Sequence, residues 1–142
     1  MARAPRHLWL VGGAALIWNA MGIVDFVLVQ TGNTQDLARL GPVQAEWFLS
    51  APLWESAIWG IATGFSLVGS ALMLLRQRPA LPFLGIGFAA FLLLSVQEFL
   101  LAPTPLDARA GPAAQTLWAA ILLVALLTWL YAWAMVRARV LR

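Results

Sequence analysis

Four long apolar stretches, separated by short polar segments, account for most of the chain. Each is long enough to cross the hydrocarbon core of a bilayer, which takes about 20 helical residues. The runs ALMLL and AAILLVALL lack the alternation of apolar and polar positions that a half-buried strand shows. Only helices and closed barrels satisfy their own backbone hydrogen bonds in lipid, so the pattern predicts helices. The predicted spans are 8–29, 52–75, 80–102 and 115–136.

The composition agrees with this pattern. Of the 142 residues, 62% are hydrophobic and only 11% are charged, whereas a soluble domain carries about 25% charged residues. We therefore predict an all-α fold, an integral membrane four-helix bundle that forms a single transmembrane domain over residues 1–142.

The predicted connections differ in length and character. The second and third spans are joined by the tight basic turn RQRP, whereas the outer loops 30–51 and 103–114 are longer. Within the first outer loop, GPVQAEWFLS predicts a short helix with Pro42 at its first position. We expect this helix to lie on the membrane surface through Trp47, Phe48 and Leu49.

The arginines predict the orientation. Seven of them fall on one side of the predicted membrane, and two, Arg39 and Arg109, fall on the other. The seven are Arg3, Arg6, Arg76, Arg78, Arg137, Arg139 and Arg142. The positive-inside rule then places both termini of this multi-pass protein in the cytoplasm (N-in/C-in). The arginines form short clusters without interleaved aromatic residues, so no nucleic-acid partner is expected.

The side-chain inventory excludes several kinds of chemistry. The chain has no cysteine and no lysine, and its only histidine, His7, precedes the first predicted span. Disulfides, thiolate metal sites and lysine Schiff bases are therefore impossible, and haem ligation by a buried histidine is not expected. The sequence also lacks a Ser/His/Asp set, a phosphate loop and a dinucleotide fingerprint. We predict a protein without enzymatic activity, metal or cofactor.

Acidic residues inside the predicted spans are the most informative feature. Asp25, Glu55 and Glu98 are the only three, and each lies a few residues from the predicted outer end of its helix. At 1.5 Å per residue, all three would lie roughly 5–7 Å below the outer boundary. Charged groups inside spans usually face the bundle interior or a wet cavity. Convergence of these acids would therefore form a polar pocket open to the outer face.

The candidate pocket residues are Trp18, Asn19, Asp25, Glu55, Trp59 and Glu98, with Gln97 and Phe91 beside them. Such a pocket would take a cation, a proton or a small polar ligand. Structural alternatives stay open at this point. Asp25 could pair with Arg39 or Arg109, and Glu55 could stabilise the start of the second helix through its dipole. Asn19 could bond between helices, and the tryptophans could serve in packing alone.

The stretches LIWNAMGIVDFVLVQTGN and FLSAPLWESAIWGIATGFSLVGSALMLLRQR resemble a family of small, largely uncharacterised four-helix bacterial inner-membrane proteins, sometimes labelled sugar transporters. The matching features are Trp18, Asn19, Gly22, Asp25, Gln30, Thr31, the Pro52–Trp54 entry, Trp59 and the Leu/Arg exit at 74–78. They cover roughly the first half of the chain. The resemblance implies the four-helix fold and a transport label, whereas Glu55 and Glu98 are not part of the family pattern.

Two functions follow as hypotheses. The first is a small non-enzymatic membrane protein that binds or transports a small polar or cationic solute in the acidic pocket, with dimerisation to provide enough helices for transport. The second is an accessory or assembly subunit that docks laterally onto a larger membrane complex and contacts partner helices, a pigment, a quinone or lipid. The expected partners are thus the lipid bilayer and either a second copy or a larger complex.

Overall fold

The structure is a computed structural model that describes residues 5–32, 35, 38–39, 42–104, 106, 108, 111 and 113–142, apart from the side chains at 43 and 44. Arg3 and Arg109, which entered the predicted orientation, lie outside the described residues, as does much of the predicted loop 103–114. The helices are α1 (Arg6–Gln30), α3 (Pro42–Ser50), α4 (Leu53–Leu74), α5 (Ala80–Val96), the π-helical turn η1 (Gln97–Leu101) and α7 (Ala114–Arg137).

The predicted all-helical class and the four spans are confirmed. Four helical segments are long and apolar enough to cross a membrane: Arg6–Gln30, Leu53–Leu74, Ala80–Leu101 and Ala114–Arg137. No strand occurs among the described residues. The short helix predicted in the first outer loop is also present, as α3, and Pro42 is its first residue.

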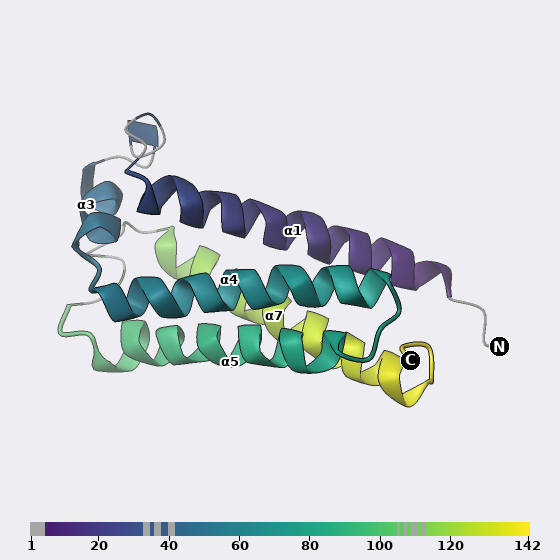
Figure 1. The fold of residues 1–142 in the computed structure, drawn as a ribbon. Coiled ribbons are helices and arrows are strands. Elements are labelled where there is room, and N and C mark those ends of the chain that lie inside the picture. The colour runs from purple at the N-terminus through teal and green to yellow at the C-terminus, as the bar shows by residue number, and fades with distance from the viewer. Residues whose placement is uncertain are drawn as a thin grey trace.

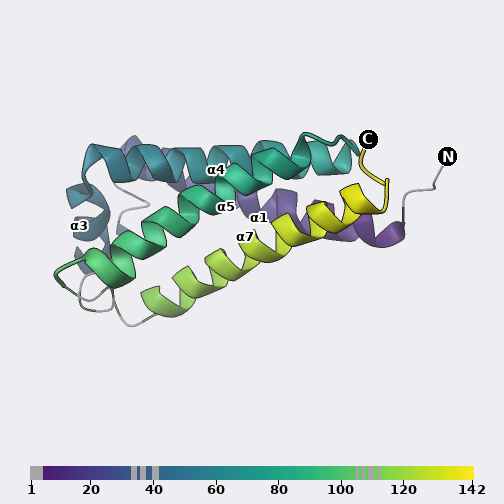
Figure 2. The same ribbon diagram turned by 90° about the horizontal axis from the view of Figure 1, so that it is seen from below.

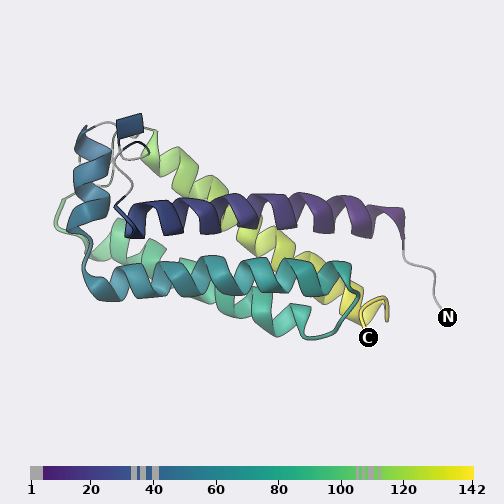
Figure 3. The same cartoon turned by 45° about the horizontal axis from the view of Figure 1, so that its top comes forward.

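The spans follow one another in space. Helix α4 packs against both α1 and α5, and α7 packs against α5. Figure 1 shows α1, α4 and α5 side by side with α7 crossing behind them, and Figures 2 and 3 show that α7 runs at an angle to α1 and α4. Helix α3 covers one end of the bundle. The two termini and the turn between α4 and α5 lie at the other end (Figure 1).

Helices α4 and α5 approach each other closely because two glycines face the partner backbone. A Cβ added to Gly87 would lie 2.2 Å from Ser66 Oγ and 3.0 Å from the carbonyl oxygen of Ala62. A Cβ added to Gly69 would lie 2.7 Å from Leu84 Cγ. Small residues that let helix backbones approach are the usual basis of helix association in lipid. Glycine at these two positions therefore lets the backbones of α4 and α5 come close together.

Helix α1 meets α4 through a stripe of residues spaced alternately four and three apart. The stripe consists of Leu8, Gly12, Ala15, Asn19, Gly22 and Phe26. A Cβ on Gly12 would lie 2.6 Å from Leu74 Cδ2, and a Cβ on Gly22 would lie 3.6 Å from Thr63 Cγ2. This spacing keeps one side of a helix against a neighbour over several turns.

The buried core is concentrated at the end that carries the termini. Its members come from all four spans and from the segment after α7: Leu8, Ala15, Met73, Ala80, Leu84, Ala132, Val140 and Leu141. By contrast, the first half of α7 contains no buried residue, since the buried residues of this helix are Thr128 and Ala132. A hydrogen bond between His7 Nδ1 and Tyr131 Oη joins α1 to α7 at the core end.

Candidate functional site

Asn19 bonds between helices inside the membrane-spanning region. Its side-chain Nδ2 donates to the carbonyl oxygen of Ala15 at 2.9 Å and to Ser70 Oγ of α4 at 3.0 Å. Ser70 is completely buried and donates in turn to the carbonyl oxygen of Ser66 at 2.8 Å. Asn19 thus bonds between helices, and both hydrogen bonds donated by its side-chain Nδ2 stay within the chain.

The three intramembrane acids lie at the end covered by α3 but in unlike surroundings. Glu98 is buried in η1, Glu55 is half-buried in the first turn of α4, and Asp25 is exposed on α1. Each takes part in at least one interaction within the chain. Among the residues that the structure describes, no three acidic or histidine side chains are close enough to hold a metal ion. The acids therefore do not form a shared cation cage.

The position of the α1 seam explains why Asp25 is exposed. Helical spacing puts Trp18, Gly22 and Asp25 on one face of α1, but the stripe that meets α4 runs through Asn19, Gly22 and Phe26. One residue along a helix turns the side chain by about 100°. Trp18 and Asp25 consequently lie at the edge of the seam, and Trp18 is 37% exposed.

Trp59 belongs to a network of aromatic rings at the end where α3 lies. The rings, in order of contact, are Phe26, Trp59, Phe48, Trp47, Trp118 and Phe91. Centroid distances between neighbours range from 4.6 Å for the Trp47–Phe48 pair to 5.9 Å for Trp47 and Trp118. The network connects α1, α4, α3, α7 and α5 in turn. Trp59 and Phe91 are therefore packing elements that tie the bundle together at this end.

Two rings of α3 differ from their predicted role. Trp47 and Phe48 were expected to hold α3 on the membrane surface, but both are half-buried against the bundle. Phe48 stacks on Trp59 at 5.3 Å, and Trp118 Nε1 donates to Ser95 Oγ at 2.9 Å. Only Leu49 of the predicted trio is strongly exposed, at 62%. Burial of the two rings among aromatic partners favours this arrangement over insertion into the membrane surface.

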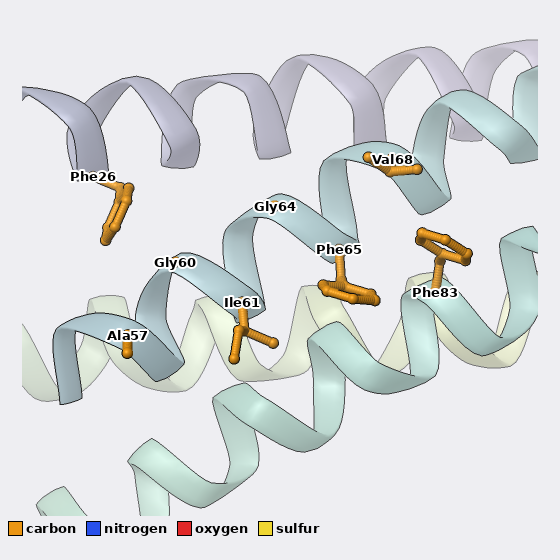
Figure 4. Close-up of a pocket in the computed structure, with 8 residues that line it drawn as sticks. All are labelled: Phe26, Ala57, Gly60, Ile61, Gly64, Phe65, Val68 and Phe83. Carbon is orange, nitrogen blue, oxygen red and sulfur yellow. The ribbon is translucent and has the colours of Figure 1, made fainter. Parts of the chain in front are cut away.

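An open apolar groove of about 490 Å³ lies on the flank of the bundle, at mid-height along α4 (Figure 4). It is lined by Phe26 of α1, by Ala57, Gly60, Ile61, Gly64, Phe65 and Val68 of α4, and by Phe83 of α5. None of the residues predicted for the acidic pocket lines it. The sequence did carry a signal for it, since GIATG at 60–64 is the small-xxx-small pattern of helix association.

Aromatic side chains bound the groove at both ends. The Phe26 ring covers Gly60, where an added Cβ would lie 2.9 Å from Phe26 Cζ. At the opposite end, Phe65 and Phe83 stack at 5.2 Å (Figure 4). Between them, a Cβ on Gly64 would meet no atom within 4 Å, so the floor of the groove is open there. The groove can accept an apolar shape, and its lining offers no group for acid–base or nucleophilic chemistry.

Comparisons of this chain with models of known protein families, with curated proteins and with solved structures find no match.

Proposed function

We propose that this protein is a non-enzymatic accessory subunit that binds a transmembrane helix of a larger membrane complex in the apolar groove on α4. The observation that carries the proposal is the open groove floor at Gly64. Glycine in the interior of a helix costs about 1 kcal/mol relative to alanine. No atom of the described residues lies within 4 Å of a Cβ built on Gly64, and Gly64, unlike Gly13, lies on the groove, where a small residue gives room to an approaching helix.

The position of the groove supports a partner inside the membrane. Ala57 and Val68 mark its extent along α4, about 16 Å at 1.5 Å per residue, and they lie within the membrane-spanning segment Leu53–Leu74. Small residues on one helix allow the backbone of another to come close, which is the main source of affinity between helices in lipid. An apolar helix of the partner satisfies both requirements.

The shape of the groove favours a different protein over a second copy. Two copies related by a twofold axis would present the same surface to each other. Concave surfaces cannot fill one another, whereas a convex ridge of large side chains on a partner helix can fill the space between Phe26 and Phe83. A partner with such a ridge makes the chain a subunit of a mixed complex.

Site-directed photo-crosslinking in native membranes tests this proposal. A photoreactive phenylalanine analogue at Val68, which is 44% exposed on the groove, should form one discrete adduct with another membrane protein. Gly64→Leu should abolish that adduct, and Gly13→Leu should leave it intact. Gly13 is the matched control because a Cβ there also meets nothing within 4 Å and the residue lies outside the groove. Adducts with lipid alone, or with a second copy alone, would contradict the proposal.

Solute binding by the acidic end is a second candidate, favoured by the environment of Glu98. This carboxyl group is only 5% exposed and lies in η1, a π-helical turn. Such turns occur frequently at functional sites, and buried intramembrane acids often mark ion or solute pathways. Under this proposal Glu98→Gln would abolish uptake of a polar or cationic solute into vesicles. Unchanged uptake with both Glu98→Gln and Asp25→Asn would exclude it.

The proposed cellular setting is a bacterial inner membrane with both termini in the cytoplasm. The arginine distribution supports this orientation, and the first half of the chain supports the proposed membership of the four-helix inner-membrane family. Because the chain has no cysteine, one cysteine added near either terminus reports its side directly. Labelling by an impermeant maleimide in intact spheroplasts would contradict a cytoplasmic position.

A further inference from the structure

The end of the bundle that carries the termini is rich in positively charged side chains. Six described arginines lie there: Arg6, Arg76, Arg78, Arg137, Arg139 and Arg142. The described acids lie toward the opposite end; Glu55 and Arg76, for example, are about 30 Å apart along α4 at 1.5 Å per residue. No carboxylate side chain of the described residues therefore neutralises this end.

Two of these arginines occupy backbone positions that glycine usually takes. Arg76 follows α4 with φ of 60°, and Arg139 follows α7 with φ of 57°. In each case the next residue closes the helix end: the amide of Gln77 donates to the Leu72 carbonyl and that of Val140 to the Met135 carbonyl, both at 2.9 Å. Glycine is the usual residue at this left-handed position, because it lacks the Cβ that is strained there. The side chain of Arg76 also bonds within the chain, since its Nε donates to the Val140 carbonyl oxygen at 3.4 Å. Helix termination alone does not explain the arginine at position 139.

Backbone hydrogen bonds hold the two arginine-bearing segments next to each other. The amide of Arg142 donates to the Arg76 carbonyl at 2.9 Å, and the amide of Arg78 donates to the Arg142 carbonyl at 2.8 Å. Val140 and Leu141 between them are buried in the core. We call residues 76–78 and 139–142 together the arginine strap. Its backbone is fixed, while the side chains of Arg78, Arg139 and Arg142 are exposed.

The strap lies at the level where lipid headgroups are expected. Trp9, near the start of α1, is 53% exposed, and Trp133, near the end of α7, is 46% exposed. The guanidinium of Arg137 lies 4.8 Å from the centre of the Trp133 ring. Exposed tryptophans at the ends of spans usually mark the membrane–water interface. The guanidinium groups of the strap are therefore within reach of phosphodiester groups in the adjacent leaflet.

We propose that the arginine strap binds the headgroup of an anionic phospholipid. Guanidinium groups bind phosphate oxygens with paired, charge-assisted hydrogen bonds, and basic clusters at the ends of spans attract anionic lipids. A zwitterionic headgroup offers the same phosphate together with a cationic amine that the arginines repel. The bound lipid is thus selected by its net charge. This inference does not depend on the partner of the α4 groove.

Lipid binding by the purified full chain in neutral detergent tests the proposal. Phosphatidylglycerol should bind about tenfold or more tightly than phosphatidylcholine, measured by native mass spectrometry, and the difference should shrink as salt screens the charges. The double substitution Arg78→Gln and Arg142→Gln should remove most of the difference. Arg78→Gln alone should remove part of the difference, whereas its matched control at the α3 end, Arg39→Gln, should leave the difference unchanged.

A further variant separates lipid binding from folding. Arg139→Gly keeps the end of α7 in its observed conformation and removes one strap charge, so it should weaken phosphatidylglycerol binding without loss of thermal stability in phosphatidylcholine. Equal binding of the two lipids by the wild type would overturn the proposal. It would also be overturned if Arg39→Gln weakened binding as much as Arg78→Gln, or if inorganic phosphate alone bound as tightly as phosphatidylglycerol.

Discussion

Asn19 of α1 and Ser70 of α4 are joined by a hydrogen bond in which Asn19 Nδ2 donates to Ser70 Oγ at 3.0 Å. Ser70 is fully buried and its hydroxyl donates a hydrogen bond to the Ser66 carbonyl oxygen, so the bond belongs to a short chain that connects two spans. Side-chain bonds between membrane helices contribute about 0.6 kcal/mol on average and about 1.7 kcal/mol at most. The contribution is therefore measurable but modest.

A double-mutant cycle on this pair gives the first prediction. Asn19→Leu and Ser70→Ala should each destabilise the protein, and the double variant should lose less than the sum of the two. We expect a coupling free energy of about 0.5–1.5 kcal/mol, measured by reversible unfolding in mixed micelles. A coupling free energy of zero would show that the two side chains contribute independently.

Alanine at two glycines of the helix bundle should have opposite effects on stability. Gly87→Ala places a methyl group 2.2 Å from Ser66 Oγ and 3.0 Å from a backbone oxygen of α4, so we expect a loss of about 1–3 kcal/mol. Gly64→Ala meets no atom within 4 Å and should stabilise the isolated chain by up to about 1 kcal/mol. Unfolding free energies in the same micelles decide this, and equal effects at both positions would contradict the described seam.

The aromatic contacts of α3 predict a contrast between adjacent residues. Phe48→Ala removes the ring that stacks on Trp59 at 5.3 Å, whereas Leu49→Ala changes a side chain that is 62% exposed. An aromatic pair contributes about 1 kcal/mol beyond its area, so Phe48→Ala should raise amide exchange in α3 roughly fivefold or more. Leu49→Ala should change it little. The reverse order would support insertion of α3 into the membrane surface.

The spans could be predicted from sequence because length and apolarity suffice for them. The expected limits 8–29 and 52–75 differ from Arg6–Gln30 and Leu53–Leu74 by no more than two residues at any end. Helix α3 was also predictable, since Pro42 suits the first turn of a helix. The spans and α3 depend on the order of neighbouring residues alone, so one sequence is enough to predict them.

The surroundings of the polar residues were harder to predict. Helical spacing shows which residues share a face, but it does not show which face meets which neighbour. The observed seam of α1 runs through Asn19 and Phe26. A seam through Trp18 and Asp25 would need the helix turned by about 100°, the angle between consecutive residues. The same limit applied to Trp47 and Phe48, whose apolar rings suit a membrane surface and a bundle interior equally well. Tertiary packing decided between the two.

The groove lies at a small-xxx-small pattern whose role the sequence alone leaves ambiguous. Gly60 and Gly64 are both glycines and lie one helical turn apart on α4. The Phe26 ring nevertheless covers Gly60, whereas Gly64 is open. A small-xxx-small pattern indicates that some helix approaches closely, and the structure is needed to separate intramolecular packing from a free surface. Gly64 is therefore the residue on which the proposed function depends most directly.

Size analysis after gentle solubilisation of native membranes tests that function most directly. The wild type and Gly13→Leu should both migrate in a complex larger than a homodimer, together with another membrane protein. Gly64→Leu should fill the groove and release the chain from that complex while its helical content stays unchanged. Migration of the wild type as a monomer or homodimer, or the same large complex with Gly64→Leu, would contradict the proposed role as an accessory subunit.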